Sequence, residues 1–195
     1  MVMQENLSLM TATEFASMPS DGKKYELVRG VLVEVCRPNL EHGYIAGRLI
    51  YYLNSFMEAH PLGVVTTESG FVIARNPDSV RGPDVAFTSH ERLQHIDETG
   101  FVQSAPDLVV EIVSPNDKQS EIDDKIDEYL AGGTKLVWLF YPKNKGGFVI
   151  RPDGDPTPFG VNSVLDGEDV LPGFSLPVRD VFKGLPTLPK VPKKD

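Results

Sequence analysis

The spacing of apolar residues predicts a long helix in the first third of the chain. Asn39 can cap its first turn and Pro61 ends it, so the helix is expected over residues 39–60. A shorter helix is expected near residues 11–18, capped by Thr11 or Thr13. Apolar side chains recur every three or four positions along the long helix, at Ile45, Leu49, Leu53 and Phe56.

A second long helix is expected over residues 116–133. Asn116 is its predicted N-cap, Gln119 completes a capping box, and Gly132-Gly133 form the exit. The apolar stripe of this helix consists of Ile122, Ile126, Tyr129 and Leu130.

Runs of β-branched and aromatic residues predict the strands. Residues 24–35 read as a hairpin that turns near Arg29-Gly30, and residues 163–182 as a turn followed by a docked C-terminal segment. A helix between two buried strands predicts a βαβ unit, whereas the early hairpin predicts antiparallel pairing, so the fold class is α/β with a mixed sheet. The other expected strands are residues 63–67, 70–74, 83–88, 107–114, 135–142 and 146–151.

The segment "PDLVVEIVSP" places a glutamate in the middle of a buried strand. Period-2 geometry puts Leu108, Val110 and Ile112 on one face and Glu111 on the other, beside Val109 and Val113. An ionised carboxylate there is costly unless a cation, a metal or several donors meet it. A structural ion pair and a functional acid are equally good interpretations of Glu111 at this point.

Length and composition indicate one globular domain. The 195 residues suit a single domain over residues 11–182, with flexible ends at 1–10 and 183–195. Cys36, the single cysteine, excludes an internal disulfide and is expected to be a buried filler residue. There is no membrane-length apolar run or signal pattern, so we expect a cytoplasmic protein. The net charge of −9 argues against broad electrostatic capture of nucleic acid.

Two further residues complete a possible catalytic group. Asp84 begins the strand after Gly82-Pro83 and can converge with Glu111 if their strands are neighbours. Hard cations such as Mg²⁺ bind one or two carboxylates together with water and phosphate oxygens. Lys125 lies about 40° from Tyr129 around the helix, at the edge of the apolar stripe. Asp124, Asp127 and Glu128 are expected on the solvent face.

Six segments in order resemble the Uma-type family of "putative restriction endonucleases", a bacterial branch of the PD-(D/E)XK nuclease superfamily. The resemblance covers roughly residues 10–182. It implies a restriction-endonuclease-like fold, in which helices flank a central mixed sheet, and a nuclease that uses Mg²⁺, with Mn²⁺ as a substitute, to cleave DNA. Nucleases of this fold often act as dimers, so a homodimer is expected. The segments are "YELVRG", "EHG", "RGPDVAF", "VVEIVSPND", "DKIDEYLAGG" and "KLVWLF".

The resemblance also assigns site residues. It maps the "PD" of the superfamily onto Pro83-Asp84 and the "(D/E)XK" acid onto Glu111, with the Ile112 carbonyl beside it as a third metal ligand. Val113 occupies the motif's lysine position, and Lys125 on the following helix matches the family's displaced lysine. Glu26 and His42 match further acidic and histidine positions of the family.

Each of these residues has a structural alternative. Lys125 can be a snorkelling lysine whose stem covers the sheet, and Glu26 a strand-face glutamate near a turn. His42 can be a surface histidine in the first turn of its helix.

Three functions therefore stay open. The first is a metal-dependent endonuclease acting on DNA. The second is a non-catalytic nucleic-acid-binding or regulatory protein on a retained nuclease fold, which the acidic balance favours. The third, another paired-carboxylate hydrolase, lacks a series of sugar-binding aromatic residues.

Overall fold

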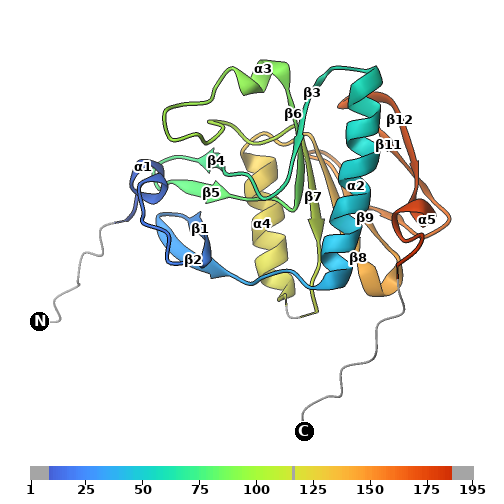
Figure 1. The fold of residues 1–195 in the computed structure, drawn as a ribbon, viewed down its shortest axis with the longest axis horizontal. Coiled ribbons are helices and arrows are strands. Elements are labelled where there is room, and N and C mark those ends of the chain that lie inside the picture. The colour runs from blue at the N-terminus through green and yellow to red at the C-terminus, as the bar shows by residue number, and fades with distance from the viewer. Residues whose placement is uncertain (1–8, 116, 186–195) are drawn as a thin grey trace, which may run out of the picture.

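A mixed six-stranded sheet forms the centre of the fold in the computed structural model, which describes residues 9–115 and 117–185 (Figure 1). The strand order is β10-β9-β8-β7-β6-β3, with β7 and β8 parallel and the other neighbours antiparallel. This architecture confirms the predicted α/β class with a mixed sheet. The strands are β3 (Gly63–Thr66), β6 (Val85–Ser89), β7 (Leu108–Ile112), β8 (Leu136–Tyr141), β9 (Gly146–Ile150) and β10 (Thr157–Phe159).

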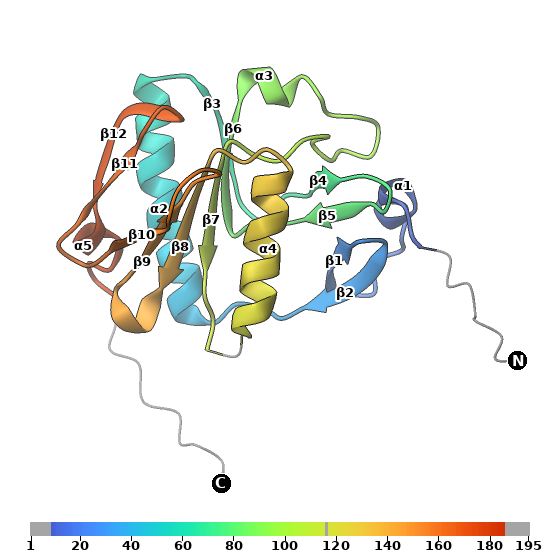
Figure 2. The same cartoon turned by 180° about the vertical axis from the view of Figure 1, so that it is seen from behind.

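Two long helices cover opposite faces of this sheet, as Figures 1 and 2 show from the two sides. Helix α2 (Leu40–Ala59) has the predicted cap, because the His42 N–H donates to Asn39 Oδ1 at 2.9 Å. Its apolar stripe packs against the face of β7 that carries Val110. Helix α4 (Gln119–Ala131) packs against the opposite face, which carries Val109. Glu111 shares the parity of Val109 and therefore faces α4.

Helix α4 connects β7 to β8 and confirms the predicted βαβ unit. It begins at Gln119 with Lys118 at the N-cap position, so the predicted start was about two residues early. The predicted cap, Asn116, lies outside the described residues. The predicted capping box was wrong: Gln119 is the first helical residue, and its amide donates to Asp123 instead. The exit at Gly132-Gly133 is confirmed, with Gly133 in the left-handed region at φ +98°.

A second, four-stranded sheet lies at one end of the molecule, in the order β2-β1-β5-β4 (Figure 1). Its hairpin turns at Arg29-Gly30 as predicted. The sequence pattern did not reveal β5, which has only three residues. The short helix α1 (Ala12–Ala16) is capped by Thr11, as expected, and Ala12 packs on this sheet. The strands are β1 (Lys24–Val28), β2 (Val31–Val35), β4 (Phe71–Ala74) and β5 (Ser79–Arg81).

The prediction that Cys36 is buried was wrong. Cys36 follows β2, the edge strand of the four-stranded sheet, and its side chain is exposed. Val31 and Val33 in the same strand are also exposed, because none of the described elements covers this part of the sheet. An apolar run at an uncovered edge therefore looks the same in sequence as a buried strand.

The C-terminal segment is more ordered than the predicted turn and docked segment. It forms a two-stranded sheet followed by helix α5 (Val178–Val181), and it packs on the α2 side of the core. Of the predicted flexible ends, residues 1–8 and 186–195 lie outside the described residues, whereas the Met10 N–H donates to the Gly30 carbonyl. None of the described helices has the length and apolarity to cross a membrane. The remaining elements are α3 (His90–Leu93), η1 (Pro142–Asn144), β11 (Val164–Gly167) and β12 (Leu171–Pro177).

Candidate active site

The pairing of β6 with β7 brings Asp84 beside Glu111. Val85 lies opposite Val110 and Ala86 opposite Val109, so one further step along this antiparallel register places Asp84 next to Glu111. The Ile112 N–H donates to Asp84 Oδ2 at 2.7 Å, which fixes the aspartate against the C-terminal end of β7. The expected convergence of the two acids on neighbouring strands is therefore present in the backbone pairing.

Lys125 reaches Glu111 from α4. Its Nζ lies 2.9 Å from Glu111 Oε1 and 3.2 Å from Glu26 Oε1. Tyr129, one helical turn later, donates its hydroxyl to Glu111 Oε1 at 2.9 Å. Only 21% of the Lys125 side chain is exposed, so its ammonium is held between carboxylates rather than extended into solvent.

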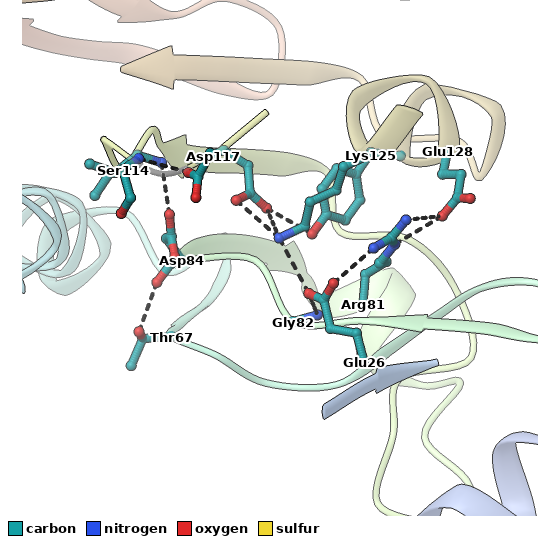
Figure 3. A network of polar contacts seen from close by, with 12 residues as sticks. Glu26, Thr67, Arg81, Gly82, Asp84, Ser114, Asp117, Lys125 and Glu128 are labelled. Atoms are coloured by element: carbon teal, nitrogen blue, oxygen red, sulfur yellow. Dashed lines mark hydrogen bonds and ion pairs between the residues drawn. The ribbon is translucent and has the colours of Figure 1, made fainter. Parts of the chain in front are cut away.

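Glu26 is a buried member of the same network. It projects from β1 and accepts a hydrogen bond from the Gly82 N–H at Oε1, 3.1 Å away. Arg81 donates from Nη1 to Glu26 Oε2 at 2.8 Å. Figure 3 shows Lys125 above Glu26, with Arg81 and Glu128 on one side and Asp84 on the other. The sequence left Glu26 as either a strand-face glutamate near a turn or a site residue, and the structure places it within this network.

His42 approaches Asp84 from the other face of the sheet. It lies in the first turn of α2, and its Nε2 is 3.0 Å from Asp84 Oδ2. The side chain is buried, and no described residue binds its Nδ1. A cavity of about 250 Å³ opens beside this pair, lined by Gly43, Gly47 and Thr67 as well as by His42 and Asp84. His42 is thus not a surface histidine.

Sequence reasoning missed or misplaced three residues of the network. Arg81 and Tyr129 received no site role, although Arg81 opens the "RGPDVAF" segment and Tyr129 follows Lys125 by one turn. Glu128 was expected on the solvent face of α4, but its side chain is only 10% exposed and binds Arg81. The prediction for Glu128 was wrong because the four-stranded sheet covers this side of α4, which the helix pattern alone does not reveal.

Burial and two neighbouring acids act against the ionisation of Glu111. Burial raises its pKa, Lys125 lowers it, and the neighbouring charges of Asp84 and Glu26 raise it again, to about 7. Burial would also raise the pKa of Glu26, but Lys125 and Arg81 outweigh it and the pKa is lowered. Burial lowers the pKa of Lys125, and the three surrounding carboxylates reverse this effect, so its pKa is raised. The ammonium of Lys125 therefore interacts with the charges of several acids at once.

The pKa of His42 is also determined by burial and by neighbouring acids. Burial lowers this pKa, whereas the hydrogen bond to Asp84 and the charges of Asp84 and Glu111 raise it, and the net shift is upward. His42 therefore adds positive charge beside Asp84 more readily than an ordinary histidine.

The donor set suits a hard divalent cation. No described residue donates a hydrogen bond to Asp84 Oδ1, and Glu111 has Asp84 and Glu26 as acidic neighbours and shares Lys125 with Glu26. Mg²⁺ is commonly held by one or two carboxylates together with water and phosphate oxygens. Within residues 9–115 and 117–185, no group of three or more His, Cys, Asp or Glu side chains is placed to hold a metal ion.

Comparisons with known proteins agree with this architecture. A family model described as "Putative restriction endonuclease" (Uma2) matches residues 12–179. The fold is similar to the crystal structure of "a putative nuclease belonging to DUF820" from Anabaena variabilis ATCC 29413, with a TM-score of 0.76 and 23% sequence identity. The similarity covers 89% of this chain and 97% of that one. A search of curated proteins found no significant match.

Proposed function

The chain belongs to the Uma2 family of restriction-endonuclease-like proteins, and on that premise we propose that it is a metal-dependent endonuclease that hydrolyses phosphodiester bonds of DNA. One observation carries the proposal: Glu111 and Asp84 meet across the β6–β7 pair, and Lys125 contacts Glu111 at 2.9 Å. Two acids at the ends of neighbouring strands, with a cation from α4 beside them, are suited to phosphate chemistry.

In this proposal, Asp84 and Glu111 hold Mg²⁺ or Mn²⁺ together with the Ile112 carbonyl. Such an ion, when bound, activates water and neutralises charge on the scissile phosphate. Lys125 places its ammonium beside Glu111 and stabilises the negative charge that develops on the phosphate. His42 keeps Asp84 oriented through Oδ2, and Glu26 sets the direction of Lys125 from the other side.

Cleavage of nucleic acid is the direct test. With Mn²⁺ present, we expect the protein to nick supercoiled DNA slowly, and more slowly as salt rises, because a charge of −9 attracts a polyanion poorly. Asp84→Asn should abolish the nicking. Wild-type protein that cleaves neither DNA nor RNA with Mn²⁺ would overturn the proposal.

The metal can be tested without activity. Millimolar Mg²⁺ or Mn²⁺ should raise the Tm of the wild type by mass action, and Asp84→Asn should lose most of that rise. Asp124→Asn is the matched control, because Asp124 is an exposed acid on α4 next to Lys125 in sequence. An equal rise in all three proteins would indicate nonspecific ion binding to an acidic surface.

The acidic net charge favours a second candidate, a non-catalytic nucleic-acid-binding or regulatory protein on the same fold. It predicts oligonucleotide binding without cleavage in the assay above. The leading proposal also includes a homodimer. Light scattering coupled to size-exclusion chromatography would measure this oligomeric state.

A further inference from the structure

Arg81 links the proposed site to the four-stranded sheet. It is the last residue of β5 and stands three positions before Asp84 in the chain. Its guanidinium is buried, with 9% of the side chain exposed. Nη1 lies 2.8 Å from Glu26 Oε2, while Nε and Nη2 lie 2.9 and 2.8 Å from Glu128 Oε2. Arg81 makes no hydrogen bond to the described atoms of Asp84 or Glu111, so any effect on them passes through its partners.

The first partner, Glu26, competes with Glu111 for Lys125. Glu26 Oε1 is 3.2 Å from Lys125 Nζ, and Glu111 Oε1 is 2.9 Å from the same atom. A buried carboxylate with Lys125 as its main cation would draw the ammonium away from Glu111. Arg81 supplies a second cation to Glu26, and this leaves Lys125 shared between the two acids.

The second partner, Glu128, fixes the helix turn that carries Lys125. Glu128 follows Lys125 by three positions on α4, so both residues lie on neighbouring turns of one helix face. By binding Glu128 and Glu26 together, Arg81 ties α4 to β1 and β5 at the level of the lysine (Figure 3). The planar guanidinium binds both carboxylates at once, which a lysine ammonium does less well.

We propose that Arg81 is a positioning residue that sets the Lys125 ammonium against Glu111 for the proposed nuclease reaction. The proposal rests on the function proposed above. A purely structural ion pair would stabilise the fold and leave turnover by the folded protein unchanged. A positioning residue changes kcat through Lys125 and loses its effect when Lys125 is absent.

The test compares Arg81→Lys, Lys125→Met and the double variant in Mn²⁺-dependent DNA nicking, well below each Tm. We expect Arg81→Lys to lower kcat about tenfold or more, with KM within about threefold and the Mn²⁺-induced rise in Tm retained. In the Lys125→Met background, the same change should lower kcat by less than about twofold. The proposal would be overturned if the losses of kcat in the two single variants add in the double variant. It would also be overturned if Arg81→Lys changes KM alone or leaves kcat unchanged.

Arg29→Met is the matched control. Arg29 also contacts Glu128, at 3.3 Å, but 67% of its side chain is exposed. Its removal should leave kcat within about twofold of the wild type. If Arg29→Met and Arg81→Lys lower kcat equally, the anchoring of Glu128 in general, and not Arg81, sets the rate.

NMR spectroscopy tests the positioning role of Arg81 independently of nuclease activity. The ¹⁵Nζ signal of Lys125, assigned by its loss in Lys125→Met, should shift or broaden in Arg81→Lys and stay unchanged in Arg29→Met. If the wild type does not cleave nucleic acid but this pattern appears, the proposed function fails and the positioning role stands. If Arg81→Lys leaves the signal unchanged, the positioning role fails whatever the activity.

Discussion

Two buried acids at opposite ends of β7 have very different surroundings. Asp107 precedes the strand and is 3% exposed; it binds the Ser89 N–H at 2.9 Å, Lys135 Nζ at 3.0 Å and Arg92 Nε at 3.3 Å. Burial would raise its pKa, but the Ser89 N–H, Lys135 and Arg92 outweigh burial, and the pKa is lowered. Glu111, four residues later, has a pKa raised to about 7.

The difference shows that burial alone does not set the direction in which the pKa of an acid shifts. Asp107 has two cations and a backbone donor and no acidic neighbour among its contacts. Glu111 shares one lysine with Glu26 and has Asp84 beside it. The first arrangement stabilises the charged form of Asp107 in the folded protein. The second keeps negative charge concentrated, which stabilises the fold less but suits a bound cation.

The largest contrast is expected between the two lysines that bind these acids. Lys125→Met keeps the bulk of the stem and removes the charge, so it should lower the nicking rate about a thousandfold at unchanged fold, through lost stabilisation of the transition state. Lys135→Met, on the Asp107 side, should leave the rate within about twofold, because 61% of the Lys135 side chain is exposed and it lies outside the site. Cleavage that persists in Lys125→Met would remove the lysine from the mechanism.

The sequence could predict much of the Glu111 surroundings because the relevant patterns are local. The period of β7 placed Glu111 opposite the face of Val110, and the stripe of α4 placed Lys125 at its edge. Arg81 and Glu128 could not be found in this way. Their burial depends on the pairing of the three-residue strand β5 with β1. This contact is non-local, and the hydrophobic periodicity of neither segment predicts it. The exposed Cys36 has the same origin, since a run of valines does not say which face stays uncovered.

The next contrast is in stability. Asp107→Asn should lower the free energy of unfolding by about 3 kcal/mol at pH 7, because it leaves Arg92 partly buried and without its carboxylate. Since the pKa of Asp107 is lowered in the folded protein, its contribution is present above its ordinary pKa and is lost as pH falls. The difference between wild type and variant in urea titrations should therefore shrink in acid. A difference that grows as pH falls would contradict the assigned contacts.

Glu111 should show the opposite dependence on pH. Its folded pKa of about 7 lies above the ordinary value of 4.5, so its contribution to stability is complete below 4.5 and is lost as pH rises through 7. In metal-free buffer, Glu111→Gln should become more stable than the wild type as pH rises across this window, by up to about 3 kcal/mol. Glu26 remains as a partner for Lys125 in this variant. A stability difference that is independent of pH between 4.5 and 8 would show that Glu111 is not destabilised by its neighbours.

The smallest effect expected is that of the Tyr129 hydroxyl. Tyr129 is fully buried and donates to Glu111 Oε1 at 2.9 Å, whereas Tyr141 donates to Gln119 at the surface. Tyr129→Phe removes a donor that favours the ionised form of Glu111, so the variant should lose about 1 kcal/mol of stability at pH 8 and less at pH 5, where Glu111 is protonated. Tyr141→Phe should change stability by less than about 0.5 kcal/mol at both pH values. Equal losses in the two variants at pH 8 would mean that the tyrosine stabilises the fold by packing, and that Glu111 depends on Lys125 alone for its charged form.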